Sequence, residues 1–272
     1  MLPRLGVSVS GYYAWLKRVP SKQEQRKLQI IERIKAIHEE SYQIYGAPKI
    51  AVLLRREGLC ISTRTVGVYM RECGIKAHYI RPHTITTKDC DFSSKLSNIL
   101  QRDFAPKSPN AVWVTDITYV HTMSGFVYLT SIIDLFSRKV IAWDVSDSLA
   151  IASTIKVVHE ALDYRFVDTP LIIHSDRGSQ FISHEYKRIT AGQTLSYSDK
   201  GTPWDNAVIE AFHAVIKREW LHRFVIRDLK HAHQLVFEFI HTFYNTHRIH
   251  GFCDYLSPDD FEFQFNRSIR YS

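Results

Sequence analysis

The chain has 272 residues, of which 45% are hydrophobic and 12% aromatic, and its net charge is +7. This composition excludes a disordered tail and indicates one good core with room for a smaller domain. Four cysteines without a Cys-x-x-Cys pair exclude a disulfide framework or zinc ribbon, and no apolar run approaches the ~18 residues of a membrane span, so we expect a cytoplasmic protein.

The positive charge is concentrated in the first part of the chain. Residues 1–100 contain 17 Lys and Arg against 8 Asp and Glu, whereas residues 101–272 contain 18 against 20. A basic module beside a near-neutral one is typical of a DNA-binding domain joined to a catalytic domain, because phosphate contacts supply the sequence-independent part of DNA affinity. On charge alone, a basic face that only meets solvent is the alternative.

Residues 1–20 have the pattern of a short helix. Gly6 favours a turn, Ser8 or Ser10 is a suitable N-cap, and the apolar side consists of Tyr12, Trp15 and Leu16. This is the pattern of the second half of a helix-turn-helix, yet only Met1 to Arg4 precede it, too few for the supporting helix. We therefore expect an incomplete motif that needs a partner to hold it in a DNA groove.

Residues 21–80 predict three further helices. The first covers Lys27 to Glu40, the second runs from Pro48 to Gly58, and the third follows a Ser62 cap and stops at Gly74. The expected inner faces are Ile30, Ile31, Ile34 and Ile37; Ile50, Leu53 and Leu54; and Val66, Tyr69 and Met70. Helix, turn and capped helix of this size predict a helix-turn-helix domain.

The outward positions of the third helix are the candidate DNA contacts. Thr63, Arg64 and Arg71 are expected to meet phosphates or base edges. A small helical packing domain without DNA contacts is nearly as compatible with the pattern. Residues 81–104 have mixed polar composition and little periodicity, and they predict a connector.

The remainder of the chain alternates strands and helices. Three successive strands are predicted at Ala111–Val120, Phe126–Asp134 and Lys139–Val145, then a helix at Ser153–Arg165 and a buried strand that ends at Asp176. A short helix near Ser183–Ile189, a strand near Thr194–Tyr197 and two long helical patterns, the second at Leu229–His247, follow. This order predicts an α/β fold of the RNase H type, a mixed sheet flanked by helices.

Three acids occupy related places in these elements. Asp116 lies within the first strand, Asp176 ends the strand that begins at Leu171, and Glu210 lies on a helix with Asp205 as its expected N-cap. That helix is expected to pack through Val208, Ala211, Phe212 and Val215, with Asn206, Glu210, His213 and Lys217 on the opposite side. The three carboxylates are therefore expected to meet at one edge of the sheet.

Carboxylates grouped in this way suit metal-assisted chemistry at phosphorus. Two Mg²⁺ ions about 4 Å apart stabilise the attacking and leaving oxygens of a phosphoryl displacement. Mg²⁺ takes oxygen ligands and retains several waters, so a few carboxylates and a substrate phosphate suffice. The roles of two neighbouring residues stay open. Asp134 ends a strand at a turn, which favours a structural role over that of a further metal ligand. His174 is expected either near the metals or in the packed core.

These stretches resemble a known family. Trp113-Val114-Thr115-Asp116-Ile117-Thr118-Tyr119, His174-Ser175-Asp176-Arg177-Gly178-Ser179-Gln180, Asp205-Asn206-Ala207-Val208-Ile209-Glu210, and Tyr244-Asn245 with Arg248, His250 and Leu256-Ser257-Pro258 are similar to the Asp-Asp-Glu transposases and retroviral integrases. The closest similarity is to the second-frame transposase protein of bacterial insertion sequences. It covers nearly the whole chain, with the helix-turn-helix at 21–80, an RNase H-like integrase core at 105–222 and a helical extension at 223–272.

The resemblance implies an activity and its requirements. Asp116, Asp176 and Glu210 would be the catalytic and metal-binding residues of a polynucleotidyl transferase that cleaves DNA at the element's ends and transfers the 3′-hydroxyl into target DNA. It implies two Mg²⁺ ions, with Mn²⁺ as a substitute, and contacts to DNA from the nearby Arg177 and Lys217. The expected partners are double-stranded DNA, further copies of this chain on that DNA, and the upstream-frame product or a frameshift fusion with it. Such a protein would associate with the nucleoid.

Two departures from the family pattern keep a second interpretation open. Only 33 residues separate Asp176 from Glu210, slightly fewer than is usual in the family, and Asp199 occupies a position where a basic residue is common. The alternative is a catalytically inactive DNA-binding regulator, or a decayed copy that retains the fold.

Overall fold

The computed structural model describes residues 6, 8–17, 19–78, 96–167 and 170–270, and it divides into two compact units, residues 1–78 and 79–272. Most of the predicted connector, residues 81–95, and the residues Met1 to Arg4 lie outside the described residues. None of the helices in the described ranges combines the length and apolar character needed to cross a membrane.

The first unit is helical, as predicted. Its helices are α1 (Val9–Leu16), α2 (Lys22–Glu40), α3 (Ala47–Arg56) and α4 (Thr63–Glu72). The α2 helix starts before the predicted Lys27 because the Ser21 hydroxyl accepts a hydrogen bond from the Glu24 amide and caps it there. The predicted Ser62 cap of α4 is confirmed, since this hydroxyl accepts from the Thr65 amide at 3.0 Å.

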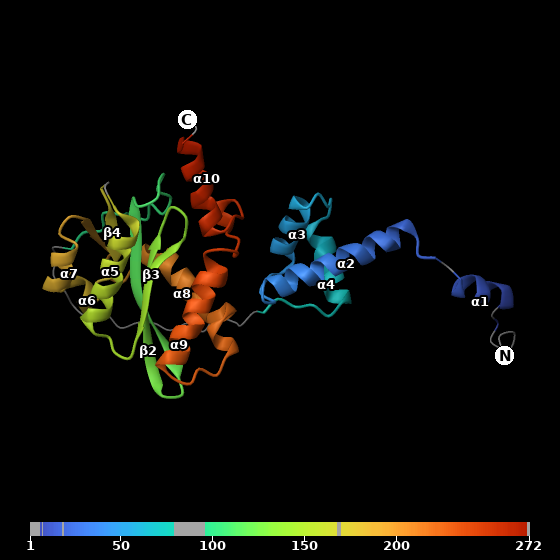
Figure 1. The fold of residues 1–272 in the computed structure, drawn as a ribbon, viewed down its shortest axis with the longest axis horizontal. Coiled ribbons are helices and arrows are strands. Elements are labelled where there is room, and N and C mark those ends of the chain that lie inside the picture. Colours follow the sequence, from blue (N-terminus) through green and yellow to red (C-terminus); the bar gives the residue numbers. More distant parts are fainter. Residues whose placement is uncertain (1–5, 7, 18, 79–95, 168–169, 271–272) are drawn as a thin grey trace. The chain divides into compact units, whose positions relative to one another are not determined.

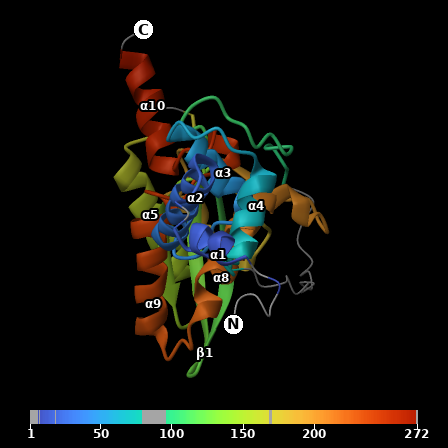
Figure 2. The same ribbon diagram turned by 90° about the vertical axis from the view of Figure 1, so that its right-hand side faces the viewer.

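Helices α2, α3 and α4 pack against one another (Figure 2). The predicted inner faces are largely confirmed, because the buried apolar residues of these helices are Ile30, Ile34, Ile37, Ile50, Ala51, Leu54, Val66 and Met70. Ile31, Leu53 and Tyr69 are only partly buried. None of the residues of α1 is buried, so this helix presents its apolar side chains to solvent.

The second unit contains a mixed five-stranded sheet and most of the helices. Its strands are β1 (Val112–Thr122), β2 (Gly125–Asp134), β3 (Val140–Ser146), β4 (Ile172–Ser175) and β5 (Thr194–Tyr197). Its helices are α5 (Ile151–Arg165), α6 (Ser179–Ile182), α7 (His184–Ile189), α8 (Ala207–Glu219), α9 (Leu229–Phe237) and α10 (Pro258–Arg270), and α9 continues as a π-helix over Glu238–Tyr244. Short 3-10 helices occur at Pro203–Asn206, Leu221–Arg223 and Gly251–Cys253.

The strand order is β3-β2-β1-β4-β5, in which β2 is antiparallel to both β1 and β3, while β4 and β5 are parallel to β1. Helix α5 packs on β2 and β3, while α8 packs on β1 and α9 on β3 and β1, on the other side of the sheet (Figure 1). The core between the sheet and α5 includes Trp113, Ile132, Val157, Val158 and Ala161. The central strand β1 is therefore covered on both faces, which is why its sequence is apolar at successive positions.

The motif near the end of the chain has a structural role in this unit. Asn245 donates its side-chain amide to the carbonyl of Val140 at 2.9 Å and accepts from the Val140 amide at 3.0 Å, so it continues the hydrogen bonding of the β3 edge. Arg248 forms a bidentate ion pair with Glu219 at the end of α8, with both contacts at 2.7 Å. These contacts fasten the C-terminal helices to the sheet and to α8.

Asp134, at the end of β2, is a buried structural residue. One of its carboxylate oxygens accepts from the Asn110 amide at 2.8 Å and the other from the Phe136 amide at 3.0 Å. Arg165, 3.9 Å away, pairs mainly with Glu262 of α10. Burial raises the pKa of Asp134 to about 6, although these amides and Arg165 oppose the shift. Its two backbone partners support the structural role that the sequence favoured.

The raised pKa predicts a pH-dependent stability. The folded core holds the Asp134 proton more tightly than the unfolded chain does, so its contribution to stability is largest below pH 4 and declines as the pH rises toward 6. Asp134→Asn removes this titration. The unfolding free energy of the variant minus that of the unmodified protein should therefore increase by about 2 kcal/mol between pH 4 and pH 7.

Urea denaturation followed by circular dichroism at several pH values measures this difference. Asp147→Asn, at an exposed position after β3, controls for the loss of one negative charge. A difference for Asp134→Asn that does not change with pH would contradict the raised pKa.

Candidate functional site

Asp116 and Asp176 lie level with each other on neighbouring parallel strands. The pairing of β1 with β4 aligns Val112 with Ile172 and Val114 with His174, and each acid follows two residues after the last of these pairs. Because parallel strands advance by the same distance per residue, both acids reach the same edge of the sheet. This register is compatible with the predicted meeting of the two carboxylates, which stays a prediction.

The face of β1 that carries Asp116 is covered by α8. Asp116 is the direct cross-strand neighbour of Ser131 on β2, and His213 of α8 lies between the two. The His213 ring places Nε2 2.8 Å from the Ser131 hydroxyl and Nδ1 3.5 Å from the Asp116 carboxylate. This buried histidine connects α8 to both strands at the site.

The predicted inner face of α8 was wrong except for Phe212. The buried residues of this helix are Ile209, Phe212, His213 and Ile216, whereas Ala211 is exposed and Val208 and Val215 are only partly buried. The prediction failed because it treated His213 as a solvent-facing polar residue, while Asp116 and Ser131 supply polar partners that make its burial favourable. Glu210 is partly exposed, and it lies three positions before His213 and so near the same strand.

Glu210 is electrostatically coupled to Asp116. Partial burial raises the pKa of Glu210, and the nearby negative charge of Asp116 raises it further. Among the described residues none donates a hydrogen bond to the Glu210 carboxylate, so its position depends on that of α8. Asp176 accepts a hydrogen bond from the Gly178 amide at 2.9 Å.

His174 belongs to the packed core. Its Nδ1 is 2.8 Å from the Ser196 hydroxyl and its Nε2 is 3.1 Å from the Ser198 hydroxyl, and the side chain is completely buried. Burial lowers the pKa of His174 to about 4, which keeps the ring neutral at physiological pH. Of the two roles that the sequence left open, the structure favours the core residue.

The two basic residues near the acids differ in their surroundings. Arg177 donates to the carbonyls of Ser198 at 2.8 Å and Leu96 at 3.2 Å, so its guanidinium is directed at the protein rather than at DNA. Lys217 donates to the Thr118 hydroxyl at 2.7 Å and lies over the ring of Tyr119. Burial lowers the pKa of Lys217, and Asp116 opposes this shift.

Asp205 is not the N-cap of α8, contrary to the prediction. Helix α8 follows the 3-10 helix Pro203–Asn206 and starts without a side-chain cap. Instead, the buried Asp205 carboxylate accepts hydrogen bonds from Asn98, Arg102, Thr202 and the Asp199 amide. Burial alone would raise the pKa of Asp205, but these bonds hold it at about 2.

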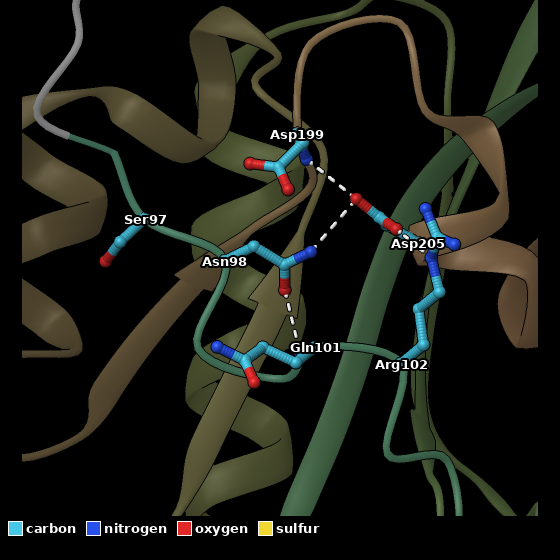
Figure 3. A pocket seen from close by; sticks show the side chains of 6 residues that line it. All are labelled: Ser97, Asn98, Gln101, Arg102, Asp199 and Asp205. Carbon is cyan, nitrogen blue, oxygen red and sulfur yellow. Dashed lines mark hydrogen bonds and ion pairs between the residues drawn. The ribbon is translucent and has the colours of Figure 1, made fainter.

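A pocket of about 450 Å³ opens beside these contacts (Figure 3). The segment 97–102 forms one wall and Asp199 and Asp205 the other, with the Asp205 side chain directed at Asn98. Sequence reasoning missed this arrangement, because the partners lie more than a hundred positions apart and no local pattern relates them.

In the first unit, the candidate DNA contacts are on α4. Arg64 and Arg71 are both exposed, and their separation of seven positions places them on one face of the helix. Arg71 also donates to the carbonyl of Gly67 within α4. Other basic side chains are already neutralised, since Arg33 pairs with Glu57 and Glu40 and Lys27 pairs with Glu72.

The donor chemistry of the three acids fits Mg²⁺. Asp116, Asp176 and Glu210 offer only carboxylate oxygens, the ligands that this hard cation prefers, and a cation would relieve the repulsion between Glu210 and Asp116. Within the described ranges, no three His, Cys, Asp or Glu side chains are gathered closely enough to hold an ion.

Comparison with known proteins gives matches over both units. A family model described as "Integrase core domain" matches residues 106–203, and a second of the same description matches residues 191–258. A model described as "HTH-like domain" matches residues 25–83. These descriptions agree with the fold predicted from the sequence, an integrase core preceded by a helix-turn-helix.

Two curated relatives match almost end to end. The transposase for insertion sequence element IS904 of Lactococcus lactis is 34% identical over 249 residues, which cover 91% of this chain and 98% of the relative. Transposase InsF for insertion sequence IS3A of Escherichia coli is 34% identical over 264 residues, covering 95% and 91%. Among solved structures, the HTLV-2 integrase catalytic core domain in complex with magnesium has a TM-score of 0.43 at 17% identity, covering 57% of this chain and 97% of that domain.

The link between α8 and the sheet predicts a measurable energetic coupling. His213→Leu leaves the buried Ser131 hydroxyl without its partner and should cost about 1–3 kcal/mol of stability. In a protein that already carries Ser131→Ala, His213→Leu should cost at least about 1 kcal/mol less, because no buried hydroxyl then loses its hydrogen-bond partner. Urea denaturation of the four proteins of this double-mutant cycle measures the coupling, and additive costs would show that the contact does not form.

Proposed function

Since this chain belongs to the transposases of insertion-sequence elements that carry an integrase core domain, we propose that Asp116, Asp176 and Glu210 are its catalytic residues. They cleave DNA at the ends of the element and join the 3′-hydroxyl to target DNA. One observation carries this assignment: the β1–β4 register sets the two aspartates level, and α8 brings Glu210 into electrostatic range of Asp116.

The three carboxylates would hold two Mg²⁺ ions, with Mn²⁺ as a substitute. When bound, such ions stabilise the attacking and leaving oxygens of the displacement at phosphorus. His213 orients Asp116 from inside the protein through its contact with Ser131. Phosphoryl transfer of this kind depends mainly on positioning and charge stabilisation, so the chain has no need of a covalent intermediate.

Lys217 is the DNA contact proposed beside the acids. It lies two turns beyond Glu210 on α8, and its ammonium is anchored by Thr118, two positions after Asp116 on β1. A lysine fixed at this point supplies a positive charge to a backbone phosphate next to the reacting bond. Arg177 is assigned a structural role because its guanidinium already binds two carbonyls of the protein.

The helix-turn-helix unit is proposed to bind duplex DNA through α4. Arg64 and Arg71 share an exposed face of that helix, which is the arrangement needed to approach phosphates or a groove. The family model for an HTH-like domain covers this unit and supports the assignment. The DNA would include both the element's ends and the target, with further copies of this chain holding the second end.

A partner is proposed to cover α1. This helix has no buried residues, and Tyr13, Trp15 and Leu16 are each more than half exposed. An amphipathic helix with a bare apolar side gains stability when a second helix covers it. The family's upstream-frame product, bound separately or fused to this chain by frameshifting, would supply that helix and complete an end-binding helix-turn-helix.

Substitution of the acids tests the catalytic assignment. Asp116→Ala, Asp176→Ala and Glu210→Ala should each lower the rate of strand transfer by at least ~100-fold, because each removes a ligand for ions that contribute several kcal/mol to phosphoryl transfer. The assay is the joining of a pre-cleaved, labelled DNA end in Mg²⁺. DNA affinity should change by less than about twofold, since loss of a carboxylate does not weaken a basic surface.

Asp163→Ala, on the exposed side of α5, is the matched control and should retain activity. Normal strand transfer by Asp176→Ala would overturn the assignment. Failure of the unmodified chain to join DNA with any metal would favour the alternative, an inactive DNA-binding regulator.

The salt dependence of DNA binding tests the helix-turn-helix. The affinity of the full chain for duplex DNA should fall steeply with salt, and Arg64→Gln or Arg71→Gln should flatten the log–log slope by about one unit for each phosphate that the variant no longer binds. Fluorescence anisotropy titrations at several salt concentrations measure the slope. Lys35→Gln, an exposed change on α2, is the control and should leave it unaltered. Equal slopes for all four proteins would make this unit a packing domain.

The partner proposal predicts that this chain alone discriminates poorly between element ends and random DNA. A version fused to the upstream-frame product should retain labelled ends against excess random DNA at moderate salt, whereas the chain alone should not. Trp15→Ala in the fusion should reduce this discrimination, because it removes apolar surface from α1. Equal discrimination by the chain alone and by the fusion would rule the proposal out.

A further inference from the structure

The segment just before β1 is joined to the loop that leads into α8. The Asp205 carboxylate accepts from Arg102 Nε at 2.6 Å and from the Asn98 side-chain amide at 2.9 Å, and it is 1% exposed. The same carboxylate accepts from the Asp199 amide at 2.9 Å (Figure 3). It also accepts from the Thr202 hydroxyl at 2.7 Å. A single buried charge thus holds both ends of the 199–205 loop and fastens that loop to residues 98–102.

The backbone of this segment is held in an unfavourable conformation. Gln101 and Arg102 have φ values of 47° and 63°, in the left-handed region that residues other than glycine rarely adopt. Two consecutive residues of this kind persist only where surrounding contacts fix them. Here the Gln101 amide donates to the Asn98 side chain, and the Ser196 hydroxyl accepts from the amides of Ile99 and Leu100.

The segment also supports the strand that leads to Asp176. Ser196, which binds two amides of the segment, contacts His174 at 2.8 Å, and His174 is the last residue of β4 to pair with β1. Arg177 donates to the carbonyl of Leu96, at the start of the segment. Residues 96–102 therefore contact the surroundings of two of the three proposed catalytic acids.

Glu210 depends on this support more than the two aspartates do. It lies near the start of a helix that begins without a side-chain cap, and no described residue donates a hydrogen bond to its carboxylate. Its place is therefore set by where α8 begins, directly after the 3-10 helix that contains Asp205. A loop released from Asp205 would leave the first turn of α8 held mainly by the packing of Ile209.

We propose that Arg102 and Asn98 are positioning residues for strand transfer, which act through Asp205 to fix the start of α8 and hence the place of Glu210. The inference rests on the catalytic role proposed for Glu210. It gives the residues between the DNA-binding unit and β1 a function in the reaction, beyond that of a connector.

Hydrogen exchange and strand-transfer kinetics on the full chain test this proposal together. Arg102→Gln should increase amide exchange about tenfold or more in residues 199–211, because a charge-assisted hydrogen bond to a buried carboxylate is removed. It should also lower the rate at saturating DNA by about tenfold, with DNA affinity changed by less than about twofold. Arg102→Lys retains a cation for Asp205 and should recover most of both effects.

Two further variants separate the proposal from simpler roles. Lys107→Gln removes an exposed positive charge five positions later and should alter neither measurement. Asn98→Ala removes an uncharged donor to Asp205 together with the acceptor for the Gln101 amide, and it should give the same pattern as Arg102→Gln. A role for Arg102 in DNA binding would instead weaken affinity and leave exchange unchanged, and that result overturns the proposal.

The remaining outcomes are also decisive. Faster exchange in residues 199–211 with an unaltered rate would show that the start of α8 does not govern the reaction. If Arg102→Gln unfolds at the assay temperature, the same two measurements are made on Asn98→Ala, and their results are interpreted in the same way. Absence of strand transfer by the unmodified chain counts against the proposed function, and unchanged exchange in both variants overturns the positioning role in that case as well.

Discussion

The parallel pairing of β1 with β4 is the constraint on which the site depends. It sets Asp116 and Asp176 level on adjacent strands, and a shift by one residue would turn one of the acids to the opposite face of the sheet. The apolar residues on either side hold this register, since Trp113 and Ile173 are paired and both are almost fully buried in the core under α5. The energy that fixes the acids therefore comes from hydrophobic packing rather than from the acids, which repel each other.

The position of Glu210 is determined by helix packing rather than by strand pairing. Glu210 comes from α8, which is held against the sheet by the buried Ile209, Phe212 and Ile216 and by the contact of His213 with Ser131. The far end of α8 is fixed by the pair of Arg248 with Glu219, and its beginning by Asp205. In the proposed site, the sheet edge and a helix secured at both ends would hold the three acids in place, while a substrate phosphate would bring further oxygen ligands.

Sequence reasoning identified the family, the order of the elements and most strand boundaries. The strands were evident because runs such as Val112 to Val120 are rich in β-branched and aromatic residues, and β5 has the predicted bounds Thr194–Tyr197. The inner face of α8 was missed because residue type alone does not reveal that His213 has two buried polar partners. The role of Asp205 was missed because capping is a local rule, whereas its donors Asn98 and Arg102 are distant in sequence. Local sequence patterns thus predicted local structure, whereas polar contacts between residues distant in sequence became evident only in the structure.

The central claim is that three carboxylates from β1, β4 and α8 act on one pair of metal ions. Anomalous diffraction from crystals of the chain bound to a pre-cleaved DNA end and soaked in Mn²⁺ tests this directly, because the scattering locates each ion independently of any activity. We expect two peaks about 4 Å apart, with Asp116, Asp176 and Glu210 all among the ligands. Mn²⁺ bound by the two aspartates with Glu210 turned away, or ions located elsewhere on the chain, would contradict this claim.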